Sequence, residues 1–247
     1  MKQNIVLLFC VSMILASCTR TTTVRRTSDY TNALAKSNGM IALSPMVEVS
    51  TVDIAGKATR NYNYENQVED TIIDVLLPKL KNKGYNVRFF SKKEVHNHAI
   101  SRDILSFKEQ YQEQINPLYV PILWEEKKAF NINSLVTKGI NVIHDTTRAD
   151  IAVLVEYNGR INTSGACMKN FAISFFIGVK DDDYAAESTS IRLTIVDIIN
   201  GKILWSNITQ AYYSMFSFDS ISSIDKVDRK RLDTLFNTLL TPLLSRS

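Results

Sequence analysis

The chain has 247 residues, with 29 basic and 25 acidic side chains and a formal net charge of +4. Hydrophobic residues make up 45% of it, and it contains eight glycines and five prolines. This composition excludes a disordered, collagen-like or disulfide-dense chain and allows one globular domain or two small ones. Such a small net charge gives no reason to expect a nucleic-acid partner.

The first eighteen residues have the organisation of a secretory signal. Lys2 is followed by an apolar run from Ile5 to Ala16, which ends in small residues. The run is shorter than the roughly 20 apolar residues that span a bilayer. A buried helix is the alternative, but a Thr- and Arg-rich polar stretch follows directly. We therefore predict an exported chain with a signal peptide over residues 1–17.

The sequence Leu15-Ala16-Ser17-Cys18 resembles the lipobox of bacterial lipoproteins. In those signals the peptidase cuts before the cysteine, whose thiol and new amino group become acylated. The resemblance implies that Leu15, Ala16 and Ser17 are the peptidase recognition residues and that Cys18 carries several acyl chains, which is what stable anchoring requires. Thr19, in place of Asp, resembles sorting to the outer membrane, with the protein facing the periplasm. No cofactor is expected besides this covalent lipid.

Cysteine usage agrees with this account. Of the three cysteines, Cys10 would leave with the signal and Cys18 would carry lipid, so that only Cys167 remains. The mature chain is therefore expected to form no intrachain disulfide, although its destination is oxidising. Cys167 has no sequence signature of a nucleophile and is expected to be a small packed thiol.

Residues 19–38 lack hydrophobic periodicity and are rich in Thr, Ser, Asn and Arg. This pattern predicts that the lipidated cysteine and a flexible tether occupy residues 18–38, before a single periplasmic domain over residues 39–247. Fully extended, about 20 residues reach only ~65 Å, so the domain is expected to lie close to its membrane.

A strand–helix–strand pattern opens the predicted domain. Alternating apolar residues over 41–49 predict a strand, which Pro45 marks as an edge or a bulge. An amphipathic helix is expected with Asn63 as its N-cap and with Gly84 ending it in the left-handed conformation. Residues 85–90 read as a second strand, and together the three elements indicate an α/β unit.

The second half of the chain supplies the rest of the predicted sheet. A helix is expected over 101–115, and residues 150–157 are apolar on both faces, as in a central strand. Asn200-Gly201 joins two β-patterned runs and predicts a hairpin with a type I′ turn. Residues 228–244 predict a long amphipathic C-terminal helix. The expected fold class is α/β, a mixed β-sheet with flanking helices.

Several blocks of the chain, in order, resemble one superfamily of bacterial lipoproteins. The blocks are Ile41-Ala-Leu-Ser-Pro-Met46, Leu76-Leu-Pro-Lys-Leu-Lys-Asn-Lys-Gly-Tyr85, Ser91-Lys-Lys-Glu-Val95, Phe107-Lys-Glu-Gln-Tyr-Gln112, Ala149-Asp150 and, most specifically, IRLTIVDIINGKILWSN from Ile191 to Asn207. The superfamily includes the curli-secretion channel lipoprotein and the lipoprotein activators of penicillin-binding proteins, and its fold is related to the N-terminal domain of the Tol–Pal translocation protein. The resemblance implies a periplasm-facing α/β lipoprotein that binds or assembles protein partners. The chain departs from the pattern at Arg148, where Gly is common, and over residues 113–147.

Candidate chemistry elsewhere is sparse. His96 and His98 would lie on one side of an extended segment and could bind a metal, but a solvated loop is the preferred interpretation. Asp181-Asp182-Asp183 lacks the later Gly and Glu of a calcium loop and is expected to be an acidic turn. The sequence contains no Gly-x-Ser-x-Gly, P-loop or dinucleotide fingerprint.

One segment has the length and alternation of a membrane-crossing β-strand, which needs about 9–11 residues. Its apolar side chains are Phe171, Ile173, Phe175, Ile177 and Val179. We expect Phe171, Ile173, Phe175 and Ile177 to belong to an ordinary strand of the sheet, with contact to a membrane or a partner as the alternative.

These observations favour a lipid-anchored, non-catalytic binding or scaffold factor for an unidentified envelope protein, and not an enzyme. The alternative is an oligomeric subunit of an outer-membrane secretion channel, which the alternation over 171–179 motivates and which would require a homo-oligomer. A metal-dependent enzyme using His96 and His98 is the third hypothesis.

Overall fold

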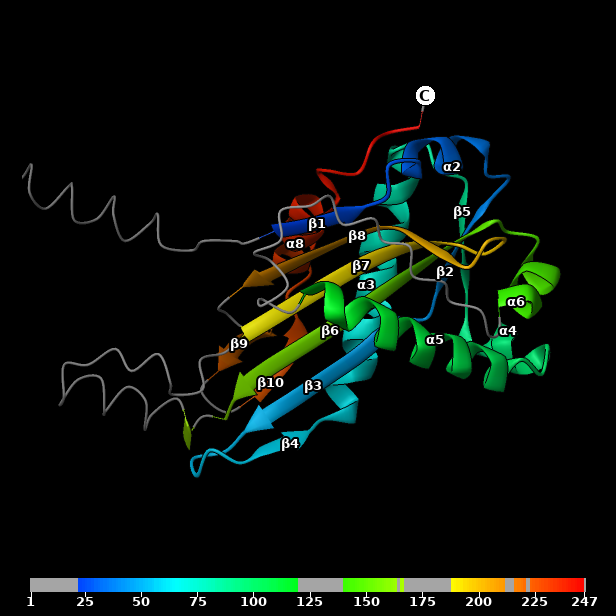
Figure 1. The fold of residues 1–247 in the computed structure, drawn as a ribbon. Coiled ribbons are helices and arrows are strands. Elements are labelled where there is room, and N and C mark those ends of the chain that lie inside the picture. Colours follow the sequence, from blue (N-terminus) through cyan, green and yellow to red (C-terminus); the bar gives the residue numbers. More distant parts are fainter. Residues whose placement is uncertain are drawn as a thin grey trace, which may run out of the picture.

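The computed structural model describes residues 22–119, 140–163, 165–166, 188–211, 216–220 and 223–246. Within these residues an eight-stranded mixed sheet has helices on both faces, which confirms the predicted α/β class (Figure 1). The helices α3 and α8 cover one face, and α5 and α6 cover the other. Among the described residues no helix is long and apolar enough to cross a bilayer.

The main sheet has the strand order β1-β8-β7-β6-β2-β5, and β3 lies beside β6 and carries β4 on its outer side. Its strands are β1 (Thr22–Arg26), β2 (Met40–Leu43), β3 (Met46–Val52), β4 (Ala58–Arg60), β5 (Val87–Phe90), β6 (Ile151–Asn162), β7 (Ser188–Asp197) and β8 (Lys202–Ala211). A separate ribbon is formed by β9 (Phe216–Ser220) and β10 (Ser223–Val227). The helices are α2 (Tyr30–Lys36), α3 (Tyr62–Asn82), α4 (Lys92–Asn97), α5 (Ser101–Ile115), α6 (Ile140–Thr147) and α8 (Arg229–Leu240), with a 3-10 turn η1 (Asn116–Tyr119) after α5.

Strand β6 is the central strand that its two-sided apolar pattern predicted. Because successive side chains alternate between faces, Val153 and Val155 join the core under α3 and α8, whereas Ala152 and Leu154 join the core under α5 and α6. The strand pairs in parallel with β2 and β3 on one side and antiparallel with β7 on the other.

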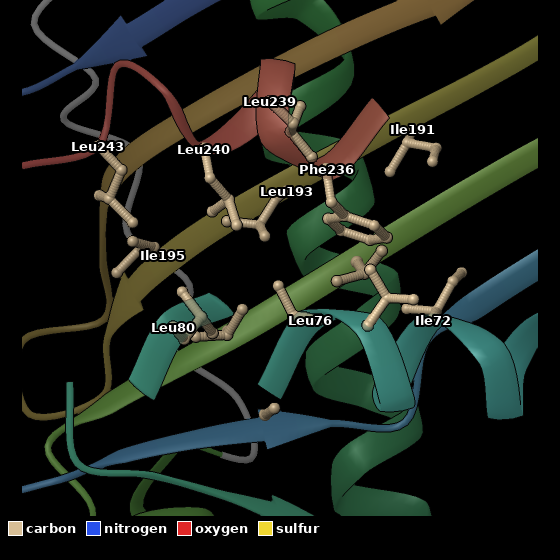
Figure 2. Packing of buried hydrophobic residues seen from close by; sticks show 14 of the residues in the cluster. Ile72, Leu76, Leu80, Ile191, Leu193, Ile195, Phe236, Leu239, Leu240 and Leu243 are labelled. Atoms are coloured by element: carbon tan, nitrogen blue, oxygen red, sulfur yellow. The ribbon is translucent and has the colours of Figure 1, made fainter. Parts of the chain in front are cut away.

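The larger core lies between the sheet and the two helices α3 and α8 (Figure 2). Helix α8 lies over β7 and β8, and helix α3 lies over β3 and β5 and against α8. The side chains labelled in this core are Ile72, Leu76, Leu80, Ile191, Leu193, Ile195, Phe236, Leu239, Leu240 and Leu243. Full burial of each such side chain contributes about 1.5–3 kcal/mol. The amphipathic helix predicted over residues 228–244 is confirmed with Asp228 as its N-cap, but it ends at Leu240.

The strand predicted over residues 41–49 is interrupted at the position of its proline. Ala42 pairs with Val153 and Met46 with Glu156, so four steps along one strand match three along β6. One extra residue on one side is a bulge, and Pro45 has no N–H to contribute to a ladder. The bulge interpretation is confirmed, and it separates β2 from β3.

Helix α3 begins two residues earlier than predicted, because Asn61 is the N-cap and its side chain accepts a hydrogen bond from the Tyr64 N–H. The helix continues through Pro78. That proline cannot bond the Asp74 carbonyl, which instead accepts a hydrogen bond from Arg229 of α8 at 3.4 Å. Gly84 follows with φ +87°, the left-handed conformation that the sequence predicted.

The predicted tether is wrong from residue 22 onward. Strand β1 pairs antiparallel with β8, from Thr22 opposite Thr209 to Arg26 opposite Trp205. Helix α2 then buries Tyr30 and Leu34 in the larger core, where they are 3% and 4% exposed. Threonine is β-branched and fits a strand, so a Thr-rich composition that resembles a linker belongs here to a sheet edge.

The predicted hairpin between β7 and β8 is confirmed, but its type I′ turn is wrong. A type I′ turn needs positive φ at two residues, and only Gly201 in this loop has one, at 65°. The Asp197 carboxylate accepts hydrogen bonds from the Ile199 and Asn200 N–H groups at 2.9 and 3.0 Å. The carboxylate thus holds a longer loop over residues 198–201.

Candidate functional site: a charged cleft at the sheet edge

One stretch of sheet edge has no neighbouring strand within the described part of the chain. On the outer side of the sheet, β5 pairs with β2 as far as Leu43, and β4 pairs with β3 only from Ser50 onward. Residues 44–49 lie between these two pairings. A cleft of about 530 Å³ opens beside them.

Helices on opposite faces of the sheet form the walls of this cleft. In Figure 1, α5 crosses in front of the sheet and α3 runs behind it. The lining side chains come from the strand edge (Met46, Val47, Glu48), from α3 (Glu65, Asn66, Glu69) and from α5 (Leu105, Lys108, Glu109, Gln112), with Arg60, Lys92, Glu156 and Asn158 around them. Most of these side chains are polar or charged, so the cleft is suited to a polar ligand.

The start of α3 closes one end of the cleft. The Glu65 carboxylate accepts a hydrogen bond from the Val49 N–H at 3.2 Å, and the Asn61 N–H donates to the Val49 carbonyl at 2.7 Å. Arg60 holds the same carboxylate through Nε at 2.6 Å and Nη2 at 3.2 Å. Both backbone groups of Val49 are therefore satisfied by α3 and its N-cap.

A half-buried lysine lies at the other end. Lys108 of α5 donates from Nζ to the Ser44 carbonyl in the bulge at 2.8 Å. The pKa of Lys108 is lowered to about 8, mainly by burial, with Glu69 opposing the shift and Lys92 adding to it. Lys92 forms a salt bridge with Glu69. Lys92 is placed by a capping box at the start of α4, in which Ser91 and Glu94 bond reciprocally.

The inner wall of the cleft contains a buried ion pair. Glu156 and Arg192 are 6% and 9% exposed and lie opposite each other on β6 and β7. Arg192 donates from Nε to Glu156 Oε1 at 3.0 Å and from Nη2 to Oε2, and Nη2 also donates to Asn116 at 2.9 Å. Removal of one partner of a buried ion pair strongly destabilises the fold, because it leaves the other charge buried and uncompensated. This pair therefore fixes the inner wall.

A chain of hydroxyl groups continues from the ion pair across the same face of the sheet. Tyr111 contacts Thr194 at 2.8 Å, Thr194 contacts Ser206 at 2.9 Å, and Tyr119 donates to Ser206 at 2.8 Å. Burial raises the pKa of Tyr119 to about 12 and that of Tyr111 well above its usual value. Both phenols therefore stay protonated at neutral pH, and their hydrogen bonds join α5 and η1 to β7 and β8.

The extended segment that would let His96 and His98 share a metal is not formed, and neither is the preferred solvated loop, because His96 is helical. His96 lies in helix α4 and His98 is its C-cap residue, so the two imidazoles are not on one side of an extended segment. Both side chains are exposed. Within the part of the chain that the structure covers, no group of three His, Cys, Asp or Glu side chains is placed to hold a metal ion.

The predicted lipidation and contact residues lie outside the described ranges. They are Leu15, Ala16, Ser17, Cys18, Phe171, Ile173, Phe175 and Ile177. Cys167 and Asp181-Asp182-Asp183 lie outside them too. No prediction about these residues is tested by the fold.

The ends of the neighbouring described strands nevertheless share one end of the sheet. Thr22 lies opposite Thr209, Thr209 opposite Ile191, and Ile191 opposite Tyr157. The first residue of β1 therefore lies toward the end of the sheet where β6 finishes and β7 starts, level with Ile191 in β7 and Tyr157 in β6 (Figure 1).

The cleft itself was missed at the sequence level. Its residues come from β3, α3, α4, α5 and β6, and no local motif joins them. Two signals were present: Glu156 interrupts an apolar central strand, and Arg192 is a charged residue at a polar position of the alternating next strand. Charged residues in such strands need a partner, but which partner depends on strand register.

Comparison with known proteins identifies no relative by sequence, because no protein-family model and no curated protein matches the chain. Among solved structures, a PelC dodecamer from Paraburkholderia phytofirmans matches with a TM-score of 0.43 and 10% identity, covering 93% of this chain and 100% of that chain. The lipoprotein GNA1162 from Neisseria meningitidis matches with a TM-score of 0.34 and 14% identity, covering 83% of this chain and 98% of that chain. At this distance the matches assign neither a family nor a function.

Proposed function

We propose that this chain is a lipid-anchored envelope protein, attached through Cys18 to the outer membrane and facing the periplasm. In this proposal it acts as a non-catalytic binding or assembly factor for an envelope protein partner. The lipobox-like sequence supports the anchor. The charged cleft beside an open strand edge supports protein binding, because a free sheet edge is a common recognition surface for another chain.

The observation that carries the proposal is where the folded domain begins. Thr22 is already paired in the sheet, four residues after Cys18. Four residues span at most about 14 Å. An acylated Cys18 would therefore hold the β1 end of the sheet against the membrane, at the end where the chain leaves β6 and enters β7. The predicted contact residues Phe171, Ile173, Phe175 and Ile177 lie between those two strands in the sequence.

Replacement of the anchoring cysteine tests the anchor. With Cys18→Ser, we expect the protein to carry no acyl groups, to retain its uncleaved signal and to be absent from the outer-membrane fraction, because the peptidase requires the lipidated cysteine. Cys10→Ser is the matched control, because Cys10 would lie in the removed signal, and it should fractionate like the unaltered protein. Membrane attachment that is the same for both variants would contradict the proposal.

The alternative function is an oligomeric subunit of an outer-membrane secretion channel. The nine-residue alternation over 171–179 favours it, because a strand of that length can cross a membrane. Light scattering of the lipidated protein in mild detergent distinguishes the two functions. A ring-sized homo-oligomer would favour the channel, whereas a monomer or small complex would favour the binding factor.

A further inference from the structure

The open stretch of β3 presents backbone groups to the cleft. The N–H and C=O groups of Val49 both point away from β6, since they bond Glu65 and Asn61. In a parallel pair, residues two apart direct their backbone groups to the same side. Val47 lies two residues before Val49, so its N–H and C=O point to the same side, into the cleft.

The open edge has a defined length. Pro45 has no N–H, Val49 is already bonded by α3, and the outer positions beyond these residues are taken by β5 and β4. This leaves room for about four residues, roughly 13 Å of extended chain at the rise of a strand. A cleft of about 530 Å³ has the size of a short peptide segment and not of a whole strand.

The unpaired charges of the cleft indicate which charge a bound peptide segment must carry. Three of its carboxylates are already paired, because Glu65, Glu69 and Glu156 bond Arg60, Lys92 and Arg192 respectively. Glu48 and Glu109 are exposed and form no salt bridge within the described ranges. The remaining cation, Lys108, has a lowered pKa and is occupied by the Ser44 carbonyl. The unpaired charge facing a ligand is therefore negative.

At the Ser44 end of the cleft, one buried polar group lacks a partner among the described residues. The Ser44 residue is 7% exposed, and its hydroxyl has no hydrogen-bond partner among the described residues. It lines an adjoining cavity of about 210 Å³ that shares Lys92 and Lys108 with the cleft. Buried hydroxyls are normally hydrogen-bonded, but this oxygen has almost no exposed surface, so a bound segment reaches it only if neighbouring side chains move.

We infer that the cleft is a strand-addition site for a short, extended, basic segment of the partner protein. The segment pairs its backbone with Val47, and its lysine or arginine side chains approach Glu48 and Glu109. This inference rests on the proposed function and specifies what the partner presents.

A peptide titration tests the inference with the full lipidated chain in mild detergent. The probe is a fluorescein-labelled, end-capped Thr-Lys-Thr-Lys-Thr, read by fluorescence anisotropy. The controls are the same peptide with Glu in place of Lys and the Lys peptide with an N-methylated central residue, which removes a backbone donor. We expect saturable binding of the Lys peptide and at least tenfold weaker binding of both controls.

Variants of the chain locate the binding. The double variant Glu48→Gln/Glu109→Gln should weaken binding of the Lys peptide at least fivefold, and hydrogen exchange of the Val47 amide should slow when the peptide is added. Glu113→Gln is the matched control, because Glu113 is exposed on the same helix but does not line the cleft. No binding of the Lys peptide up to millimolar concentration, or equal binding by the Glu peptide, overturns the inference. An unaffected double variant also overturns it.

Crosslinking in cells separates this inference from the function on which it rests. A photocrosslinking residue is placed at Gln112, which lines the cleft, at Glu113 beside it, and at Asp233 on α8. We expect a crosslinked partner peptide containing Lys or Arg from position 112 only, and its loss with Glu48→Gln/Glu109→Gln. Partners captured only at Asp233 would overturn the cleft assignment while leaving the binding function intact. No captured partner at any of the three positions would count against both.

Discussion

At the scale of single residues, Lys108 makes stability depend on pH in a specific direction. Its pKa is lowered by burial to about 8 in the folded chain, against an ordinary value of 10.5. Between these two values the unfolded chain binds more protons at this site than the folded chain, so the contribution of Lys108 to stability rises with pH.

We therefore expect the free energy of unfolding of the unaltered chain to rise from pH 8 to pH 10 relative to Lys108→Met. Urea unfolding at several pH values measures this difference. Other groups that titrate in that range are common to both proteins and cancel in the comparison. Parallel curves for the two proteins would show that the Lys108 ammonium is not desolvated in the fold.

Gly84 gives a second residue-level prediction. Its φ of +87° is strained for other residues, and an added Cβ would collide with the Arg246 carbonyl oxygen. We expect Gly84→Ala to lower the free energy of unfolding by about 2 kcal/mol or more. Gly39→Ala is the control, because nothing lies within 4 Å of its added Cβ, and it should change stability by less than about 0.5 kcal/mol. Equal effects of the two substitutions would contradict the described C-terminal contact.

The structural role of a single residue was predictable from the sequence where its residue type favours one backbone conformation. Pro45 and Gly84 behave as their chemistry requires, as a bulge and a left-handed cap. Glu156 and Arg192 were not predictable as a pair, because their contact depends on the register of β6 and β7. The number of residues between Glu156 and Arg192 in the sequence does not determine that register.

At the scale of elements, the strand β1 is the main departure from the sequence-based expectation. Helices α5 and α8 were predicted because their apolar residues recur at helical spacing and bury one face. Strand β1 has five residues, of which Val24 is its one apolar side chain. It is identified by its pairing with β8, which no local pattern reveals.

A proline substitution tests whether β1 is a paired strand or a tether. The Thr27 N–H donates to the Leu204 carbonyl at 2.9 Å. Because alternate residues of an antiparallel strand bond the same neighbour, the Thr23 N–H also points toward β8. We expect Thr23→Pro to lower the free energy of unfolding by about 1–3 kcal/mol more than Thr23→Ala, which retains the N–H. A flexible tether would tolerate both substitutions equally in thermal unfolding.

At the scale of the whole molecule, the sequence predicted the α/β class and the central position of β6, but not the cleft. The fold class follows from the order of the helices and strands and from their hydrophobic periodicity, and both can be seen locally in the sequence. The cleft arises because β5 ends early and β4 starts late along one strand edge. That mismatch is a property of strand lengths and register, which become visible only in the assembled sheet.

The proposed attachment of the domain to the membrane depends on the anchor at Cys18 and on the short connection from it to Thr22. The most direct test is the intact mass of the protein extracted from membranes in mild detergent. We predict a mature chain that begins at Cys18 and carries the added mass of several acyl groups. An unacylated mass, or a chain that still begins at Met1, would contradict the account.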